Sequence, residues 1–373
     1  MNLAASTTIG TLGVLCNNSS GDPPFTEAFF CKNLSLSAPK YGLKVIVLRP
    51  KDLIGAHPFV TGYVYEENTW KQKVFPAPDI LYNRCISVTG LPSLSRGHHS
   101  QIKSHFWTAW SRALPGKWRV YQMLRKDNTL EPFLPPTRRY TGIPSLEQAL
   151  EAFEHQVFLK PSGGCQGRST LRVTLQKGVL TVHGRSTANE PFQHVFRECT
   201  KGMRWIHAFI KERTFLIQPF LHLYSIDEKP FDVRVLMQKN EHGNWMRTGS
   251  ALRQGAAGGI TSNLHGGGTA AQVLPFLQKE YGKEAAHQIE TTINRLSMHI
   301  SVHLEQHFGR LGELGIDFGI DREGNPWLLE VNSKPGRASF KQSGDLQSAS
   351  LATENPLRYA RYLLLRQLRR VNP

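Results

Sequence analysis

Two segments near residue 320 alternate apolar and polar positions with a period of two, which is typical of β-strands that bury one face. In the first, residues 313–320, Asp317 lies opposite the apolar side chains. In the second, residues 326–332, one face carries Trp327, Leu329 and Val331, and the other carries Leu328, Glu330 and Asn332. A polar Arg-Glu-Gly-Asn turn lies between the segments. The pattern predicts an antiparallel hairpin with Asp317 opposite or diagonal to Glu330.

The N-terminal region has the pattern of a small α/β domain. Runs rich in β-forming residues lie at 9–16, 44–48 and 79–82, and a helix-length segment at 24–40 separates the first two. Short strands joined through a helix favour a parallel sheet.

A proline-dense segment, residues 130–144, predicts an extended linker after this domain. Ser145 then stands where it can cap a helix that has an apolar face, with Gln148 three residues on. A strand from Val157, a glycine loop and a hairpin within residues 169–183 follow.

The second half of the chain contains further strand patterns. Residues 214–221 predict a buried strand that ends in a proline-marked bend, and residues 231–237 alternate apolar with charged side chains. Residues 255–268 are rich in glycine and form either a flap over a site or a flexible connection; the adjacent Arg253 favours the flap. We expect three units, residues 1–115, 116–213 and 214–373.

Composition is that of an ordinary globular protein. The 373 residues are 40% hydrophobic and 10% aromatic, enough for two or three domains with real cores. No run of 18 apolar residues predicts a membrane span, and the N-terminus lacks a signal-peptide pattern, so we expect a cytoplasmic protein. The five cysteines form no Cys-x-x-Cys pair and indicate neither a disulfide framework nor a zinc site.

The formal net charge of +16 would attract polyanions, nucleic acid included. The basic residues are spread along the chain, with one concentration at residues 355–370. That segment has helical spacing and an apolar stripe, which favours a helix packed on the domain with a solvated basic rim over a membrane or nucleic-acid helix. Aromatic and basic residues do not interleave as they do in nucleic-acid modules, so we do not expect a nucleic-acid partner.

The polar face of the hairpin carries ligands suited to Mg²⁺. Asp317 and Glu330 would repel each other on one face unless a cation neutralised them, and Asn332 adds an amide oxygen. Mg²⁺ usually keeps one or two protein carboxylates and fills its other positions with water and phosphate oxygens, so the hairpin suggests a nearby nucleoside triphosphate. The competing interpretation is an edge hairpin whose polar face is solvated.

The glycine loop around Ser162, Gly163 and Gly164 offers a second place for phosphate. Glycines let backbone N–H groups turn toward a phosphate without a Cβ in the way, and Lys160 on the preceding strand would add a positive charge. A plain flexible turn explains the glycines equally well, and the Gly-x-x-x-x-Gly-Lys-Ser/Thr motif is absent.

Two other groups of charged residues allow ordinary explanations. Asp232 and Arg234 share a sheet face, where a surface ion pair competes with a functional role. Four histidines in the helical pattern of residues 270–308 are expected to be surface or core residues, because no carboxylate-rich metal spacing accompanies them. These are His287, His299, His303 and His307.

The order of these motifs resembles the ATP-grasp superfamily. The sequence Leu-Glu-Val-Asn-Ser-Lys-Pro-Gly at residues 329–336, with an aspartate thirteen residues before the glutamate, is similar to the magnesium motif of that superfamily. The resemblance covers residues 116–340. Five segments resemble the YheC/YheD group of endospore coat-associated proteins, namely residues 79–84, 117–118, 134–137, 231–234 and 262–264.

The resemblance implies an α/β fold in which a small N-terminal domain precedes a two-subdomain ATP-grasp, with ATP and Mg²⁺ as cofactors. It implies that Asp317, Glu330 and Asn332 hold Mg²⁺, and that Arg234 and Arg253 neutralise the transferred phosphoryl group. The implied nucleotide-binding set is Lys117, Lys160, Ser162, Gly163, Gly164, Gln218, Pro219, Phe220, Leu221 and Asp227. The usual arginine two residues before the metal aspartate is Gly315 here, so another arginine must hold the anionic intermediate.

The implied activity is ATP-dependent ligation of a carboxylate to an amine through an acylphosphate. This chemistry needs charge neutralisation and in-line positioning more than a covalent nucleophile, which agrees with the lack of a Ser-His or Cys-His constellation. The alternative is a nucleotide-binding structural protein of the spore with little turnover, which Gly315 favours. The acid, the amine and the oligomeric state stay open.

Overall fold

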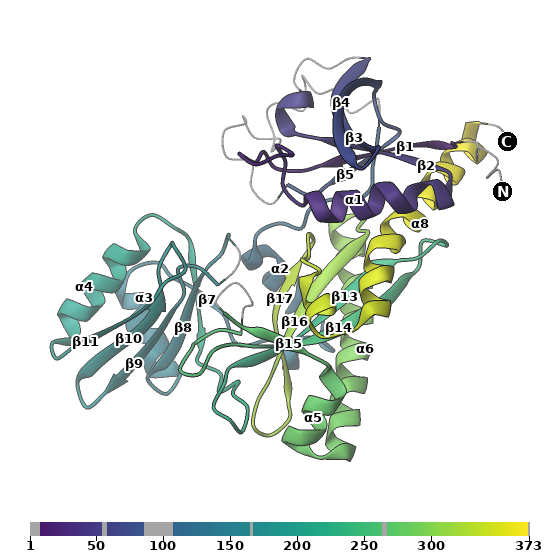
Figure 1. Cartoon of the computed structure of the whole chain (residues 1–373). Helices are drawn as coiled ribbons and strands as arrows, with labels where there is room; N and C mark the ends of the chain where they lie inside the picture. Colours follow the sequence, from purple (N-terminus) through teal and green to yellow (C-terminus); the bar gives the residue numbers. More distant parts are fainter. Residues whose placement is uncertain (1–7, 54–57, 86–106, 165–166, 263–266, 372–373) are drawn as a thin grey trace.

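The computed structural model describes residues 8–371 apart from 54–57, 86–106, 165–166 and 263–266. These residues form three β-sheets that follow one another along the chain, with helices packed on them (Figure 1). The sheets belong to an α/β fold of the predicted class. None of the helices in the described ranges is long and apolar enough to cross a membrane.

The first sheet has the strand order β4-β3-β2-β1-β5-β6. Its strands are Gly10–Leu15 (β1), Leu43–Leu48 (β2), Phe59–Glu66 (β3), Thr69–Pro76 (β4), Ile80–Asn83 (β5) and Thr108–Ala109 (β6). As predicted, β1 pairs in parallel with β2 and β5, and helix α1 (Ala28–Ser37) lies between β1 and β2 in sequence. The sequence does not predict the antiparallel β3–β4 hairpin, because β4 is mostly polar and exposed.

The C-terminal helix, α8 (Leu346–Val371), lies beside α1 although it ends the chain (Figure 1). Its apolar stripe buries Leu357, Ala360 and Leu364 in the core that β1 and α1 share. The prediction of a helix packed on the fold is confirmed, and the helix starts at Leu346 rather than at residue 355.

The second sheet is antiparallel, with the order β11-β10-β9-β8-β12-β7, and α3 and α4 cover one face of it (Figure 1). Its elements are Arg138–Arg139 (β7), Gln156–Pro161 (β8), Leu171–Gln176 (β9), Val179–Arg185 (β10), Pro191–Phe196 (β11), Phe215–Pro219 (β12), Ile143–Ala152 (α3) and Cys199–Ile210 (α4). The predicted strand, loop and hairpin order is confirmed.

Two local predictions in this region are wrong. The linker over residues 130–144 is not fully extended, because it contains a 3₁₀ turn at Glu131–Phe133 and the start of helix α3 at Ile143; the short strand β7 lies between them. Helix α3 starts at Ile143 with Gly142 as its N-cap, so Ser145 lies inside the first turn. The Ser145 hydroxyl instead donates to the Gly142 carbonyl. Pro144 fits this earlier start, since proline is tolerated in the first turn of a helix.

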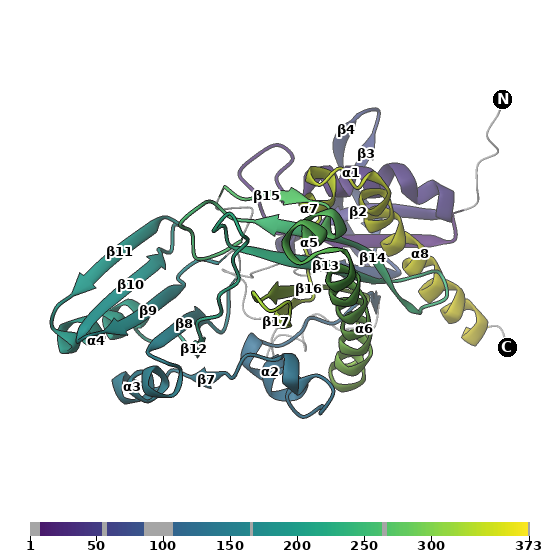
Figure 2. The same ribbon diagram turned by 90° about the horizontal axis from the view of Figure 1, so that it is seen from below.

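The third sheet has the order β15-β14-β13-β16-β17 and is antiparallel throughout. Its strands are Phe231–Lys239 (β13), Trp245–Gln254 (β14), Thr269–Ala271 (β15), Glu313–Ile320 (β16) and Pro326–Asn332 (β17). One face packs its apolar side chains on three helices, Lys117–Leu124 (α2), Val273–Tyr281 (α5) and Lys283–Phe308 (α6). The short helix α7 (Ala338–Gln342) and part of α8 cover the other face. Figure 2 shows α2 below β17 of this sheet, with β7 of the second sheet on one side and α6 on the other.

The predicted hairpin of β16 and β17 is confirmed, and Asp317 stands opposite Glu330. The predicted face of Leu328 is wrong. The register shifts after Asp317, so Phe318 pairs with Leu328 and leaves Leu329 as an extra residue. This β-bulge turns Leu328 into the apolar core beside Val331, while Glu330 stays on the side of Asp317.

Candidate functional site

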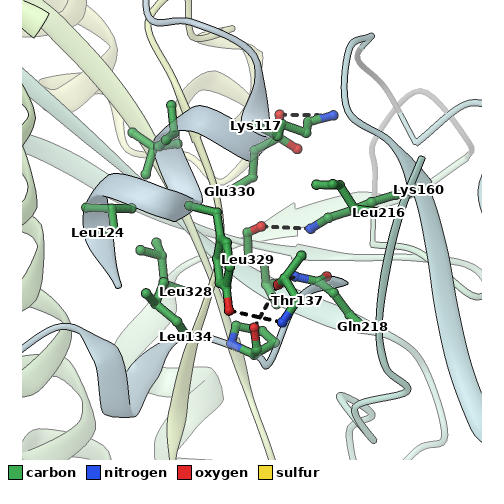
Figure 3. A pocket seen from close by; sticks show the side chains of 14 residues that line it. Lys117, Leu124, Leu134, Thr137, Lys160, Leu216, Gln218, Leu328, Leu329 and Glu330 are labelled. Atoms are coloured by element: carbon green, nitrogen blue, oxygen red, sulfur yellow. Dashed lines mark hydrogen bonds and ion pairs between the residues drawn. The ribbon is translucent and has the colours of Figure 1, made fainter. Parts of the chain in front are cut away.

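A pocket lies where α2, the second sheet and strand β17 meet (Figure 3). Its apolar walls come from Val120, Leu124, Leu134, Leu216 and Leu328, among others. Polar groups of Lys117, Thr137, Lys160, Gln218 and Glu330 also line it. An apolar slot with a few convergent polar groups is the usual form of a small-molecule site.

Lys117 connects the glycine loop with the β16–β17 hairpin. Its ammonium donates to the Gly164 carbonyl at 3.1 Å and lies 3.5 Å from a Glu330 carboxylate oxygen. The glycine loop leaves open space here, because a Cβ on Gly163 or Gly164 would meet nothing within 4 Å. Gly164 also has a φ of +99°, which side-chain-bearing residues rarely adopt. Residues 165–166 of this predicted loop lie outside the described ranges.

Lys160 projects from β8 toward the bulge in β17. Its ammonium donates to the Leu329 carbonyl at 3.0 Å (Figure 3). Burial lowers the pKa of Lys160 to about 8, and Glu330 and Asp317 only partly oppose this effect. The lysine is therefore mostly protonated at pH 7, and an additional anion in the pocket would favour its charged form.

Gln218 is the bend residue that lines the pocket, and its side-chain amide donates to the Thr137 hydroxyl at 2.8 Å. The next residues of the bend, Pro219, Phe220 and Leu221, are not among those that line it. Phe220 instead packs against Arg172, whose guanidinium carbon lies 3.9 Å from the centre of the Phe220 ring. Asp227 lies on an exposed turn and pairs with Lys279 at 3.0 Å.

Two buried arginines hold Asp317. Arg234 lies directly opposite it across β13 and β16 and donates to both carboxylate oxygens. Arg253 approaches the same carboxylate at 3.0 Å and donates twice to Asp232, at 2.6 Å each, across β13 and β14. The interpretation of Asp232 and Arg234 as a surface ion pair is wrong, because both are buried and each pairs with a different strand. Ser262 also donates to Asp232.

These contacts determine the charge of the site. Burial would raise the pKa of Asp317, but Arg234 and Arg253 outweigh it and hold that pKa at about 2, so the carboxylate is ionised at neutral pH. The neighbourhood has four cations, Lys117, Lys160, Arg234 and Arg253, against three carboxylates, Asp232, Asp317 and Glu330. The difference of one positive charge favours an anionic ligand.

The structure shows which arginine stands near Gly315. A Cβ on Gly315 would lie 3.4 Å from Nη1 of Arg234 and 2.7 Å from Cβ of Pro335. Arg234 thus lies beside the position where the resemblance leads one to expect an arginine, whereas the neighbour that leaves no room for a Cβ on Gly315 is Pro335.

The donor atoms of the hairpin fit a hard cation. Glu330, Asp317 and Asn332 supply only oxygen donors from their carboxylates and amide carbonyl, as Mg²⁺ prefers. The Glu330 side chain is about a quarter exposed, at 24%, and reaches the pocket. Asp317 would have to exchange a guanidinium contact for the metal, since both of its oxygens accept from Arg234.

A buried charge network that the sequence did not single out connects the first sheet to this hairpin. At its centre is Glu313, which is fully buried at the start of β16. It accepts hydrogen bonds from Tyr82, Arg84, Gln238 and Arg337. Arg84 also pairs with Glu27 at 2.8 Å. The sequence contains two signals: Glu313 shares the period-two face of Asp317, and Tyr82 and Arg84 lie in the segment 79–84 that resembles the YheC/YheD group. The partners are distant from Glu313 along the chain.

Comparison with known proteins agrees with this architecture. A family model described as YheC/D like ATP-grasp matches residues 108–363. The endospore coat-associated protein YheC of Bacillus subtilis (strain 168) is 28% identical over 355 residues, which is 91% of this chain and 94% of that protein. The endospore coat-associated protein YheD of the same strain is 30% identical over 310 residues, 82% of this chain and 67% of YheD.

Two solved structures share the fold over nearly the full length. The D-cycloserine synthetase DcsG has a TM-score of 0.54 at 12% identity, with 96% of this chain and 99% of that chain covered. D-alanyl-alanine synthetase A from Vibrio cholerae O1 biovar eltor has a TM-score of 0.50 at 13% identity, with 95% and 99% covered. The family match spans well over half of the residues, so this chain belongs to the YheC/YheD-like family of ATP-grasp proteins.

Proposed function

We propose that this protein is an ATP- and Mg²⁺-dependent ligase that joins a carboxylate to an amine through an acylphosphate. The observation that supports this most is the convergence of four cationic side chains on a carboxylate-bearing hairpin beside an apolar pocket. An excess of positive charge suits a triphosphate and the anionic species made from it. The names of its relatives further suggest a role in forming the spore or the cell envelope.

The pocket residues have distinct roles in nucleotide binding. The apolar slot between α2 and β12 takes the adenine, with Gln218 and Thr137 presenting polar groups at its edge. Lys117 and Lys160 bind phosphate oxygens through charge-assisted hydrogen bonds. The open backbone of Ser162, Gly163 and Gly164 cradles the same phosphates.

Glu330 and Asn332 would hold Mg²⁺, and Asp317 joins them when it exchanges one guanidinium contact. When bound, Mg²⁺ supplies charge neutralisation to the phosphate oxygens. Arg253 is positioned by its two bonds to Asp232, so it requires little reorganisation to meet an anion.

The reaction needs orientation and charge neutralisation. A carboxylate oxygen of the substrate attacks the γ-phosphorus in line with the departing ADP, and Arg234 and Arg253 stabilise the negative charge on the transferred group. The amine then attacks the acyl carbon, phosphate leaves, and an amide forms. No side chain has to become covalently modified, which fits a site built from cations and carboxylates.

Isotope transfer tests this proposal directly. The protein is incubated with Mg²⁺, ATP, an amine pool and a pool of acids labelled with ¹⁸O in their carboxylates. A ligase that works through an acylphosphate transfers one labelled oxygen to the released phosphate. Glu330→Gln should abolish both ADP and labelled phosphate, whereas Glu323→Gln, on the exposed turn of the same hairpin, should not. Labelled phosphate from the Glu330 variant at the wild-type rate would contradict the proposal.

The alternative is a nucleotide-binding structural protein of the spore with little turnover. It is favoured by the engagement of both Asp317 oxygens with arginine and by the coat-associated names of the relatives. Under this alternative ATP binds, and no acid and amine pair releases ADP.

A further inference from the structure

A second group of metal-ligating side chains lies away from the pocket, on helix α6. His299 and His303 are four residues apart and so project from the same face of this helix. Asp127, which follows α2 and is 172 residues before His299, faces them. From the sequence, these histidines are expected to be surface or core residues because no carboxylate-rich spacing accompanies them; the carboxylate that meets these two comes from a distant segment, which local spacing does not reveal.

The three side chains point their donor atoms toward one another. Oδ2 of Asp127 lies 2.7 Å from Nε2 of His299 and 3.3 Å from Nδ1 of His303. One ligand atom from each residue falls within 4.8 Å of the other two. Ligands of a tetrahedral zinc ion, bound at about 2.0–2.1 Å, stand roughly 3.3 Å apart, so small side-chain rotations complete the arrangement.

Backbone groups orient the carboxylate of Asp127 toward the two histidines. Oδ1 of Asp127 accepts from the backbone N–H groups of Thr129 and Leu130, at 2.9 and 3.2 Å, which turns Oδ2 toward the histidines. Among the described residues, the buried Nε2 of His303 has no hydrogen-bond partner within the usual distance and angle.

We propose that Asp127, His299 and His303 form a binding site for a divalent transition-metal ion of the Zn²⁺ class, with water completing the coordination. Two imidazoles and one carboxylate suit Zn²⁺ and its neighbours in the transition series, whereas Mg²⁺ prefers oxygen ligands alone. The site is therefore chemically distinct from the carboxylate hairpin and does not depend on the proposed ligase activity.

The position of this site suggests a use. Helix α2 carries Lys117 at its start and lines the pocket with Val120, Tyr121 and Leu124. Asp127 follows that helix closely, whereas both histidines belong to α6 beneath the third sheet. A bound ion would fasten α2 to α6 and so restrict the motion of one wall of the pocket.

Calorimetry with Zn²⁺ tests the site on the full-length, chelator-treated protein without nucleotide. We expect one ion per chain, with affinity lowered about tenfold or more by His299→Ala, since losing even an outer partner of a metal ligand costs that much. Asp127→Asn should lower it similarly. His287→Ala, on the same helix but outside the cluster, is the matched control and should bind as wild type does.

Cobalt spectroscopy provides a second readout that does not depend on stability. Co²⁺ in the wild-type site should give the visible absorption of nitrogen-ligated cobalt, and His299→Ala should lose it; His299 is exposed, so this variant should keep its fold. The proposal is overturned if wild type binds neither ion, or if the His299 and Asp127 variants bind as tightly as the control. In either of those cases the cluster is a histidine–aspartate ion pair only.

Discussion

The two ends of the candidate site are built differently. Around Asp317, buried arginines and carboxylates satisfy one another, and Arg234, Arg253 and Asp232 are each more than nine-tenths buried. Around Glu330, the lysines have weak or backbone partners, and the glycine loop borders open space. The comparison teaches that the Asp317 end is preorganised by ion pairs among its own side chains. At the Glu330 end, the ammonium groups of the lysines are available to bind an anionic ligand. Substitutions at the two ends should therefore have different consequences.

The largest effect is expected from breaking the buried pair. Arg234→Ala should lower the free energy of unfolding by about 3–5 kcal/mol, because it leaves the Asp317 charge buried without its main partner. Urea denaturation followed by circular dichroism measures this. The double variant Arg234→Met with Asp317→Asn should recover part of the loss, and an equal or larger loss in the double variant would contradict this account of the pair.

At the open end, a substitution should affect binding and leave stability almost unchanged. Lys117→Met should weaken ATP binding by about 1.5–3 kcal/mol, as expected for a charge-assisted hydrogen bond, and change unfolding by less than about 0.5 kcal/mol. Calorimetry and thermal denaturation on the same sample separate the two quantities. Lys201→Ala, an exposed lysine on α4, serves as the control. Unchanged ATP affinity in Lys117→Met would remove Lys117 from the phosphate site.

Gly315 tests the close approach of Pro335 to strand β16. Gly315→Ala should destabilise the protein by about 1–3 kcal/mol, because the new Cβ would lie 2.7 Å from Cβ of Pro335. Thermal denaturation measures the loss. Gly336→Ala is the matched control, since a Cβ there would meet nothing within 4 Å. Equal melting temperatures for both variants would show that the hairpin can adjust to fill this space.

The smallest effect is a pH dependence that comes from Lys160. Its folded-state pKa of about 8 lies below the usual 10.5, so the unfolded chain binds more protons between these values and this group's contribution to stability rises with pH there. ATP binding should change in the opposite direction, weakening as pH rises through 8 because the free lysine loses its proton. Calorimetry in buffers of different ionisation enthalpy should detect proton uptake on binding. Lys160→Arg should abolish that dependence, and the same dependence in the arginine variant would contradict the assignment.

The sequence predicted the hairpin and the pairing of Asp317 with Glu330, because a period-two pattern and a short turn specify them locally. It did not predict the bulge at Leu329, since an inserted residue leaves the apolar composition of the strand unchanged. One of its two alternatives paired Asp232 with Arg234, whereas Asp232 pairs with Arg253 on a neighbouring strand. The register between two strands depends on the packing of the whole sheet, so it cannot be predicted from the sequence pattern of one strand.

The sequence also did not predict clusters whose members are far apart along the chain, because the pattern of one segment does not show which distant segment it contacts. Glu313 accepts hydrogen bonds from Tyr82 and Arg84, which lie at the end of β5, and Asp127, which follows α2, meets His299 of α6. Motif order nevertheless indicated the correct family, because the residues that define it stay in sequence order. The division of the chain at residues 115 and 213 stays a prediction.

The central claim is that the cationic pocket and the carboxylate hairpin together bind ATP with Mg²⁺. Calorimetric titration of ATP into wild type, Glu330→Gln and Glu323→Gln, each with and without Mg²⁺, tests it most directly. We predict that Mg²⁺ strengthens ATP binding in wild type and in Glu323→Gln, and that this gain disappears in Glu330→Gln. Absence of ATP binding to wild type, or an equal gain from Mg²⁺ in all three proteins, would contradict the claim.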